Sequence, residues 1–128
     1  MKILGIGVDV IKNKRIQNLI NKKSFINRTF GKNEVMLSKK SSNKTNYFAK
    51  RFAAKEAFAK SLGTGISGGL SFKEIEIKSN KLGKPTLQVV GKSLKVVKKV
   101  IKNKKFYTFL SISDDKPFAI AIIILTTK

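Results

Sequence analysis

Two carboxylates in apolar surroundings are the side chains best suited to do chemistry in this sequence. Asp9 follows a strand-like segment at residues 2–8, and Glu56 lies inside the mostly apolar segment 51–65. The whole chain has only 7 acidic residues against 28 basic ones. Because burying an unpaired charge costs free energy, each carboxylate needs a partner in such surroundings. A divalent cation between Asp9 and Glu56 would serve both of them.

The composition narrows this chemistry further. The chain has no histidine and no cysteine, which removes imidazole as a base and thiolate as a nucleophile. Zinc is disfavoured for the same reason, because zinc sites in proteins prefer nitrogen and sulfur ligands. Acid–base work is left to carboxylates, lysines, hydroxyls and metal-bound water.

The length of 128 residues is that of one domain, so we expect a single domain over 1–128. The first residues lack the long apolar stretch and cleavage site of a signal peptide. The apolar run at 118–125 is too short to cross a bilayer. These features predict a cytoplasmic protein with no membrane partner.

The formal net charge of +21 attracts polyanions and speeds encounter with acidic partners. Nucleic acid is the generic partner of small basic proteins. Most of the lysines are scattered, however, and no zinc-finger or RNP signature is present, so no specific nucleic acid is predicted. A strongly acidic protein or a phosphorylated nucleotide would suit the same surface.

Hydrophobic periodicity divides the chain into helices and strands. The segments predicted as strands are 2–8, 71–78, 86–90, 107–113 and 117–126, and those predicted as helical are 11–21, 25–30, 33–40, 46–62 and 93–101. Loops or turns are expected at 41–45, 66–70 and 80–85, and around Asp114 and Asp115 in the last hairpin. Helices set between strand hairpins indicate an α+β fold with a largely antiparallel sheet.

Each candidate residue also has an ordinary structural explanation. Asp9 could be a cap or turn aspartate, and Gly5 and Gly7 could serve a turn or a close contact. Glu56 and Lys60 have the i, i+4 spacing of an exposed helix ion pair, worth about 0.3–0.5 kcal/mol. The apolar residues on most sides of this helix argue instead that it is buried.

Four stretches of the chain occur together in a characteristic order. They are GIGVDV at 5–10, RFAAKEAFAKSLGTGI at 51–66, GKP at 83–85 and FLSISDDKPFAIA at 109–121. This order resembles that of the holo-acyl-carrier-protein synthases, the small phosphopantetheinyl transferases, over nearly the whole chain.

The resemblance implies a phosphopantetheinyl transferase fold and a matching activity. Enzymes of this family transfer 4'-phosphopantetheine from coenzyme A to a serine of apo acyl carrier protein and release adenosine 3',5'-bisphosphate. The resemblance also implies a Mg2+ cofactor, an acidic carrier protein as partner, and a homotrimer with active sites between subunits.

The resemblance assigns roles to the residues singled out above. The family residues that match Asp9 and Glu56 bind Mg2+, and the one that matches Lys60 contacts phosphate. Mg2+ takes one or two carboxylates together with substrate phosphates and waters, which these residues and a pyrophosphate would provide. Lys60 would add a point charge beside the leaving phosphate, so Lys60 and Glu56 are the catalytic candidates. Glu56 is the candidate to take the proton of the carrier's serine, and Arg51 is expected at a coenzyme phosphate.

Further positions match the nucleotide pocket and the carrier surface of the family. Gly63, Gly65, Lys84 and Pro85 match residues that border the coenzyme. Gly63 also follows a helix C-terminus, where it would cap the helix, and the segment around Pro85 could be only a hairpin turn. Arg15 matches the family's carrier-binding arginine, and its guanidinium can bind a carboxylate bidentately.

The chain departs from the family pattern at Asp114. The family usually has Ser-x-Ser-His or Ser-x-Thr-His in the penultimate strand, whereas this chain has Ser-Ile-Ser-Asp at 111–114. The family histidine lies at the coenzyme pocket, so Asp114 is expected there as well. A carboxylate at that place repels a nearby phosphate unless a lysine or a metal lies between them, and Lys116 is close enough in sequence to be that lysine.

Two rival functions remain beside the transferase. One is a small nucleic-acid-binding protein, which would bind in a strongly salt-dependent way without using Asp9 or Glu56. The other, suggested by Asp114, is a weakened relative that binds the carrier or the coenzyme but transfers slowly.

Overall fold

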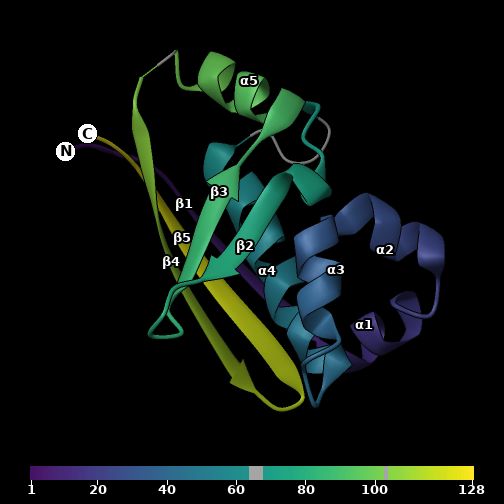
Figure 1. The fold of residues 1–128 in the computed structure, drawn as a ribbon. Helices are drawn as coiled ribbons and strands as arrows, with labels where there is room; N and C mark the ends of the chain where they lie inside the picture. The colour runs from purple at the N-terminus through teal and green to yellow at the C-terminus, as the bar shows by residue number, and fades with distance from the viewer. Residues whose placement is uncertain (64–67, 103) are drawn as a thin grey trace.

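The structure, a computed structural model, describes residues 1–63, 68–102 and 104–128. Within them, one strand is followed by four α-helices, a two-stranded hairpin, a fifth α-helix and a second hairpin (Figure 1). The strands are β1 (Ile3–Lys12), β2 (Ile75–Ser79), β3 (Pro85–Val89), β4 (Phe106–Asp115) and β5 (Phe118–Thr127). The α-helices are α1 (Asn13–Leu19), α2 (Lys23–Thr29), α3 (Lys32–Ser38), α4 (Lys44–Leu62) and α5 (Gly91–Val100), and a 3-10 turn, η2, covers Phe72–Glu74.

All strand pairs in the described residues are antiparallel, but they form two sheets. The larger sheet has the order β1-β5-β4, and β2 and β3 form a separate hairpin. Helix α4 lies against the larger sheet, and the short helices α1, α2 and α3 gather at one side of it (Figure 1). The predicted α+β class is therefore confirmed, with two antiparallel sheets in place of the one expected.

Helix α4 is the centre of the core. The Asn43 side chain caps its N-terminus by accepting from the Asn46 backbone N–H at 3.0 Å. Gly63 ends it in the left-handed conformation at φ 78°, which a residue without a side chain adopts at low cost. The predicted cap at Gly63 is thus confirmed. Twelve of the 19 helix residues are buried, so this helix is held mainly by packing rather than by solvated ion pairs.

Two glycines of β1 let α4 approach the sheet closely. A Cβ placed on Gly5 would overlap the backbone oxygen of Ser61, and one placed on Gly7 would overlap that of Ala57. Both glycines therefore serve a close contact between backbones and neither lies in a turn. This contact brings the C-terminal half of α4 against the same face of β1 that carries Asp9.

Several predicted boundaries were wrong, and one of them bears on the site. Strand β1 continues to Lys12 because its pairing with β5 runs without a break from Gly5 through Lys12. Asp9, expected at the end of the strand, is therefore inside it, opposite Ala121. The 3-10 turn η2 replaces the start of the strand predicted at 71–78, and Asp114 and Asp115 belong to β4 rather than to a turn. The loop predicted at 66–70 lies partly outside the described residues.

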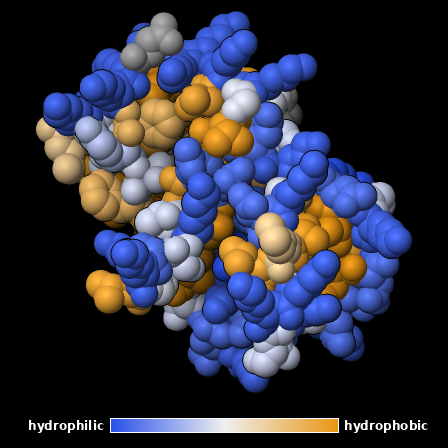
Figure 2. Space-filling view, in the orientation of Figure 1, coloured by the Kyte–Doolittle hydropathy of each residue, from blue (hydrophilic) through white to orange (hydrophobic). Residues whose placement is uncertain are grey.

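The outer face of the larger sheet carries a row of apolar side chains. Side chains of one strand alternate between the two faces of a sheet, so Gly5, Gly7 and Asp9 face α4 while Ile6, Val8 and Val10 face away. The exposed large apolar residues of this outer face are Ile6, Val8, Val10, Tyr107, Phe109 and Ile122. The face of the molecule seen in Figure 2 is mostly hydrophilic, with apolar areas beside α5 and over the short helices. No helix in the described part of the chain is long and apolar enough to cross a bilayer.

Candidate active site

Asp9 and Lys60 meet where β1 and α4 touch. Lys60 Nζ donates to Asp9 Oδ1 at 3.1 Å and to the backbone oxygen of Val8 at 3.0 Å. The side chain of Lys60 is 55% exposed, whereas that of Asp9 is 15% exposed. The i, i+4 ion pair that sequence spacing suggests between Glu56 and Lys60 is absent from the ion pairs of the described residues. Lys60 instead turns toward the strand, because β1 offers it a carboxylate and a carbonyl.

Glu56 lies one helical turn before Lys60 and is half-buried. Burial raises the pKa of Glu56, and the nearby carboxylate of Asp9 raises it further, while Lys60 and Arg15 lower it by a smaller amount. Two carboxylates close enough to repel each other are unfavourable without a cation between them. The site thus holds two carboxylates that the cations around them only partly compensate.

This arrangement suits a magnesium ion. Mg2+ is bound in proteins by one or two carboxylates together with substrate phosphates and water, rather than by a cage of protein ligands. Asp9 and Glu56 supply two such carboxylates, and no group of three or more ligating side chains exists among the described residues. The donor set therefore fits Mg2+ completed by a phosphorylated substrate, and it does not fit a fully protein-enclosed metal.

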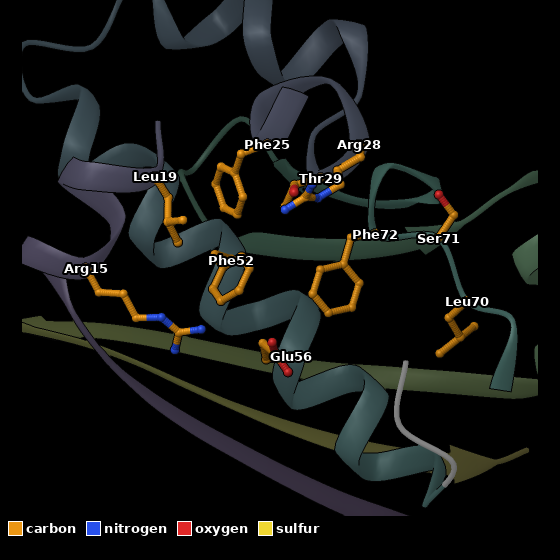
Figure 3. A pocket seen from close by; sticks show the side chains of 10 residues that line it. All are labelled: Arg15, Leu19, Phe25, Arg28, Thr29, Phe52, Glu56, Leu70, Ser71 and Phe72. Carbon is orange, nitrogen blue, oxygen red and sulfur yellow. The ribbon is translucent and has the colours of Figure 1, made fainter. Parts of the chain in front are cut away.

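A cavity of about 510 Å³ opens beside Glu56 (Figure 3). It is lined by Arg15, Leu19, Phe25, Arg28, Thr29, Phe52, Glu56, Leu70, Ser71 and Phe72. Figure 3 shows the rings of Phe25, Phe52 and Phe72 on its walls, with the guanidinium of Arg15 reaching from α1 toward α4. The Arg15 guanidinium lies 5.8 Å from the centre of the Phe52 ring, within cation–π range. We name this space the Glu56 cavity.

A second cavity, of about 160 Å³, lies on another side of α4. It is lined by Lys50, Arg51, Ile77, Ser79, Gly83, Pro85, Ile112 and Asp114, and we name it the Asp114 cavity. It brings together three of the residues expected at the coenzyme, Arg51, Pro85 and Asp114, which come from α4, β3 and β4. Lys84 lies between two lining residues, in the turn that joins β2 to β3. The segment around Pro85 is therefore a hairpin turn and also a wall of this cavity.

The charged groups of the Asp114 cavity are held firmly. Asn46 Nδ2 donates to Asp114 Oδ2 at 2.7 Å, and this hydrogen bond, helped by Lys50 and Lys116, lowers the pKa of Asp114. Arg51 stacks on the ring of Tyr47, with its guanidinium carbon 3.5 Å from the ring centre. Burial lowers the pKa of Arg51. Its buried Nε has no hydrogen-bond partner in the described part of the chain, which is a group that a ligand or a bridging water would satisfy.

The two cavities open on different faces of the same helix. Arg51 and Glu56 are five residues apart, which places them about 140° apart around the helix axis. The Glu56 cavity is walled by α1, α2 and η2, whereas the Asp114 cavity is walled by β2, β3 and β4. A single chain therefore does not gather all the predicted coenzyme residues at one place. Gly63 lies at the end of α4, and Gly65 is outside the described residues.

A buried ion pair that was not predicted from the sequence lies one residue from Glu56. Lys55 is fully buried, and its Nζ donates to Glu34 Oε1 at 2.7 Å and to the backbone oxygens of Phe72 and Ile75 at 2.7 and 2.6 Å. A signal for it was present. Lys55 falls in the apolar stripe Phe48, Phe52, Ala59 and Leu62, whose spacing of three and four residues predicts one buried helix face.

Comparison with known proteins identifies the class to which this fold and site belong. Residues 5–123 match the model of the 4'-phosphopantetheinyl transferase superfamily, and the chain belongs to that family.

Within the superfamily, the similar proteins are holo-acyl-carrier-protein synthases. The chain is 49% identical to the holo-[acyl-carrier-protein] synthase of Pelagibacter ubique over 128 residues, which is 100% of each protein. The crystal structure of the Neisseria meningitidis holo-[acyl-carrier-protein] synthase is similar with a TM-score of 0.86 and 36% identity, over 98% of this chain and 99% of the other. The Bacillus anthracis synthase, solved in complex with CoA (3',5'-ADP), has a TM-score of 0.82 and 34% identity, with 100% of both chains covered. The predicted family and fold are confirmed by these relatives.

Proposed function

We propose that this chain transfers 4'-phosphopantetheine from coenzyme A to a serine of apo acyl carrier protein through the cluster of Asp9, Glu56 and Lys60. The enzyme class and the reaction follow from the family to which the chain belongs. Family membership also decides against the nucleic-acid-binding rival. The observation that supports the residue roles is the meeting of two carboxylates and one exposed lysine where β1 crosses α4.

Asp9 and Glu56 would hold the cation of this reaction. Enzymes of the family are generally Mg2+-dependent, and the carboxylates of Asp9 and Glu56 fit that ion. When bound, Mg2+ neutralises charge on the pyrophosphate of the coenzyme. Lys60 lies beside Asp9 with more than half of its side chain in solvent. It can leave Asp9 and bind a phosphate oxygen at little cost, since exposed ion pairs contribute at most about 1 kcal/mol.

Glu56 is the group best placed to accept the proton of the attacking serine. Burial and the nearby Asp9 raise the pKa of Glu56 in the absence of a cation, and a carboxylate is one of the side chains that can take a proton from an attacking hydroxyl. The carboxylate also borders the cavity through which a carrier serine would approach. Asp9 is paired with Lys60, so it is less suited to accept this proton.

The acidic carrier would dock beside the Glu56 cavity. Arg15 lines that cavity from the exposed side of α1, and Arg28 lines it from α2. An arginine there can bind a carboxylate of the carrier while apolar residues of the two proteins pack together. The net charge of +21 would attract the carrier from a distance.

The protein would act as a homotrimer with active sites between subunits. Two features support this assembly. The outer face of the β1-β5-β4 sheet exposes six large apolar side chains, which is a typical sign of a protein interface. The Asp114 cavity and the Glu56 cavity of one chain also open on different faces of α4, so a coenzyme that touches both kinds of residue would lie between two chains.

The oligomer can be tested separately from the chemistry. Ile122 lies in the middle strand of the apolar face and is 40% exposed. Ile122→Lys would place a charge in the interface and convert trimers to monomers. Light scattering of the wild-type chain and of this variant checks the assembly, and Leu82→Lys, in an exposed turn, is the matched control. A wild-type chain that is monomeric at micromolar concentration would contradict the trimer.

We place this enzyme in the cytoplasm. The alternative that it is a weakened relative, which binds but transfers slowly, is tested by a direct assay of transfer. The mass of apo acyl carrier protein is measured after incubation with this protein, coenzyme A and Mg2+. A gain of one phosphopantetheine, lost with EDTA and in Asp9→Ala but kept in Asp115→Ala, supports both the reaction and the metal site. No gain with the folded protein and several carriers would contradict the proposed function.

A further inference from the structure

The Asp114 cavity is lined by side chains of both charges, whereas a simple phosphate site is lined by positive ones. Lys50 and Arg51 line it from α4, and Asp114 lines it from β4. Its volume of about 160 Å³ is below the roughly 300–1,000 Å³ of pockets that enclose a whole ligand. A coenzyme would therefore place only one part in it, and that part would have to satisfy two cations and a carboxylate together.

The carboxylate of Asp114 is fixed in position and available to a ligand. Asn46 donates to Oδ2 at 2.7 Å, and Asp114 pairs with Ala119 in the β4–β5 hairpin, so both ends of the side chain are anchored. The residue is nevertheless exposed. Lys50 and Lys116 favour its ionised form, and an ionised carboxylate accepts hydrogen bonds but donates none.

An acceptor of this kind selects a hydroxyl over a phosphate. A phosphate oxygen has no proton to donate to Asp114, and its charge is repelled by the carboxylate. A ribose hydroxyl donates readily, as it does to the acidic residue of dinucleotide-binding folds. Lys50 remains as a group that a phosphate would bind, and so does Arg51, whose Nε has no hydrogen-bond partner among the described residues.

We propose that Asp114 binds a ribose hydroxyl of the coenzyme and thereby makes this enzyme tolerant of coenzymes that lack the 3'-phosphate. The inference rests on the proposed function, because it takes the Asp114 cavity as the place of the nucleotide end of coenzyme A. Dephospho-coenzyme A carries a 3'-hydroxyl where coenzyme A carries a phosphate. It would offer Asp114 a donor and remove a repelled charge, while its pantetheine and pyrophosphate are the same.

The test compares kcat/KM for coenzyme A and for dephospho-coenzyme A in the carrier mass assay. We expect the wild-type chain to prefer coenzyme A by less than about tenfold. Binding of the 3'-phosphate by Lys50 and Arg51 favours coenzyme A, but coenzyme A lacks the 3'-hydroxyl that would donate to Asp114, so the two effects offset each other. Asp114→His, which removes the carboxylate and adds a donor, should shift the ratio of the two kcat/KM values toward coenzyme A by at least about tenfold.

Two further variants make the result decisive. Asp114→Asn keeps the size and one acceptor oxygen but loses the charge, so it should shift the ratio in the same direction by about threefold or more. Asp115→Asn is the matched control, because this exposed neighbour points to the other side of the strand and should leave the ratio unchanged. A shift below tenfold in Asp114→His, or an equal shift in Asp115→Asn, overturns the inference. If Asp114→His does not fold, Asp114→Asn decides by its threefold threshold.

A binding measurement separates failure of the inference from failure of the proposed function. Calorimetry with adenosine 3',5'-bisphosphate and with adenosine 5'-monophosphate reports the same ratio without any transfer. If the carrier gains mass but neither the kcat/KM ratio nor the binding ratio changes in the Asp114 variants, only the inference is overturned. A carrier that never gains mass contradicts the proposed function, and the binding ratio in the Asp114 variants then still decides the role of this residue.

Discussion

Lys55 and Glu56 are neighbours on one helix, yet their environments are opposite. Lys55 is fully buried and has three hydrogen-bond acceptors, one of them the carboxylate of Glu34. Glu34 in turn accepts from the backbone N–H groups of Gly31 at 3.0 Å and Ile77 at 3.2 Å. Burial lowers the pKa of Lys55, and the Glu34 carboxylate opposes that shift. The ion pair of Lys55 and Glu34 joins α3, α4 and β2, and each of its two charges has a partner of opposite sign.

Glu56 is half-buried and stands near a second carboxylate, with a raised pKa. Adjacent residues of one helix therefore have two different roles. A charge whose partners are all inside the protein stabilises the fold, whereas a charge left partly uncompensated beside a cavity is ready for a ligand. Substitutions at the two positions should therefore separate stability from activity.

The largest effect is expected from Glu56→Gln. Loss of this carboxylate removes both a metal ligand and the proposed base, so kcat/KM in the carrier mass assay should fall by at least about 10³-fold, or about 4 kcal/mol. Chemical denaturation in EDTA should show unchanged or slightly greater stability, by about 0.5 kcal/mol or less. A variant that keeps a tenth of the activity would remove Glu56 from the mechanism.

Lys55→Met should show the reverse pattern. Removing one partner of a buried ion pair leaves the other charge uncompensated, and a loss of about 3 kcal/mol is expected, at the low end of the usual range because Glu34 keeps two backbone donors. Urea denaturation measures this loss, and transfer per folded molecule should stay within about threefold of wild type. Combining it with Glu34→Leu should recover part of the stability. A fully stable single variant would contradict the assigned role of the pair.

Gly7→Ala tests the close contact that assembles the site. The added Cβ would overlap the Ala57 backbone oxygen, so α4 has to move away from β1, at a cost of about 2 kcal/mol. Activity should fall with it, because Asp9 is on the strand and Glu56 on the helix. Thr86→Ala, at an exposed position of β3 outside the apolar face, is the control, and thermal unfolding with parallel activity assays checks both. Equal stability of the two variants would argue against the contact.

Lys60→Gln should have a smaller effect on the reaction. The amide keeps a hydrogen-bond donor but loses the charge that would meet the phosphate, so kcat/KM should fall by about tenfold, mainly through KM for coenzyme A. Stability should hardly change, because the ion pair with Asp9 is more than half exposed on the lysine side. The steady-state parameters for coenzyme A give the result, and a loss confined to the carrier's KM would contradict it.

The smallest effect is the pH dependence of the metal-free protein. The pKa of Glu56 is raised in the folded state, so its ionisation costs stability. The favourable contribution of the protonated form is complete below the unfolded pKa and is lost as pH rises through the folded pKa. The stability of Glu56→Gln relative to wild type should therefore increase from pH 4 to pH 7, by less than about 1 kcal/mol. Denaturation in EDTA across this range measures it, and a decrease would reverse the sign we assign.

The sequence by itself determined the family and the fold class, and it predicted a set of site residues. Period and composition predicted α4 and its end at Gly63 because Ala-rich helices and glycine caps depend on local backbone preferences. The last hairpin was predicted within two residues for the same reason. Asp9, Glu56 and Lys60 lie in the motifs that this chain shares with the family, and their roles in this chain remain predictions.

Only the tertiary structure decided which charges meet. Sequence spacing favours Glu56 with Lys60, but the close packing of α4 on Gly7 gives Lys60 a nearer partner in Asp9. Lys55 and Glu34 are 21 residues apart, and the Asp114 cavity joins α4 to three strands. Pairings of this kind depend on where the sheets and helices lie in space, which local sequence preferences do not specify.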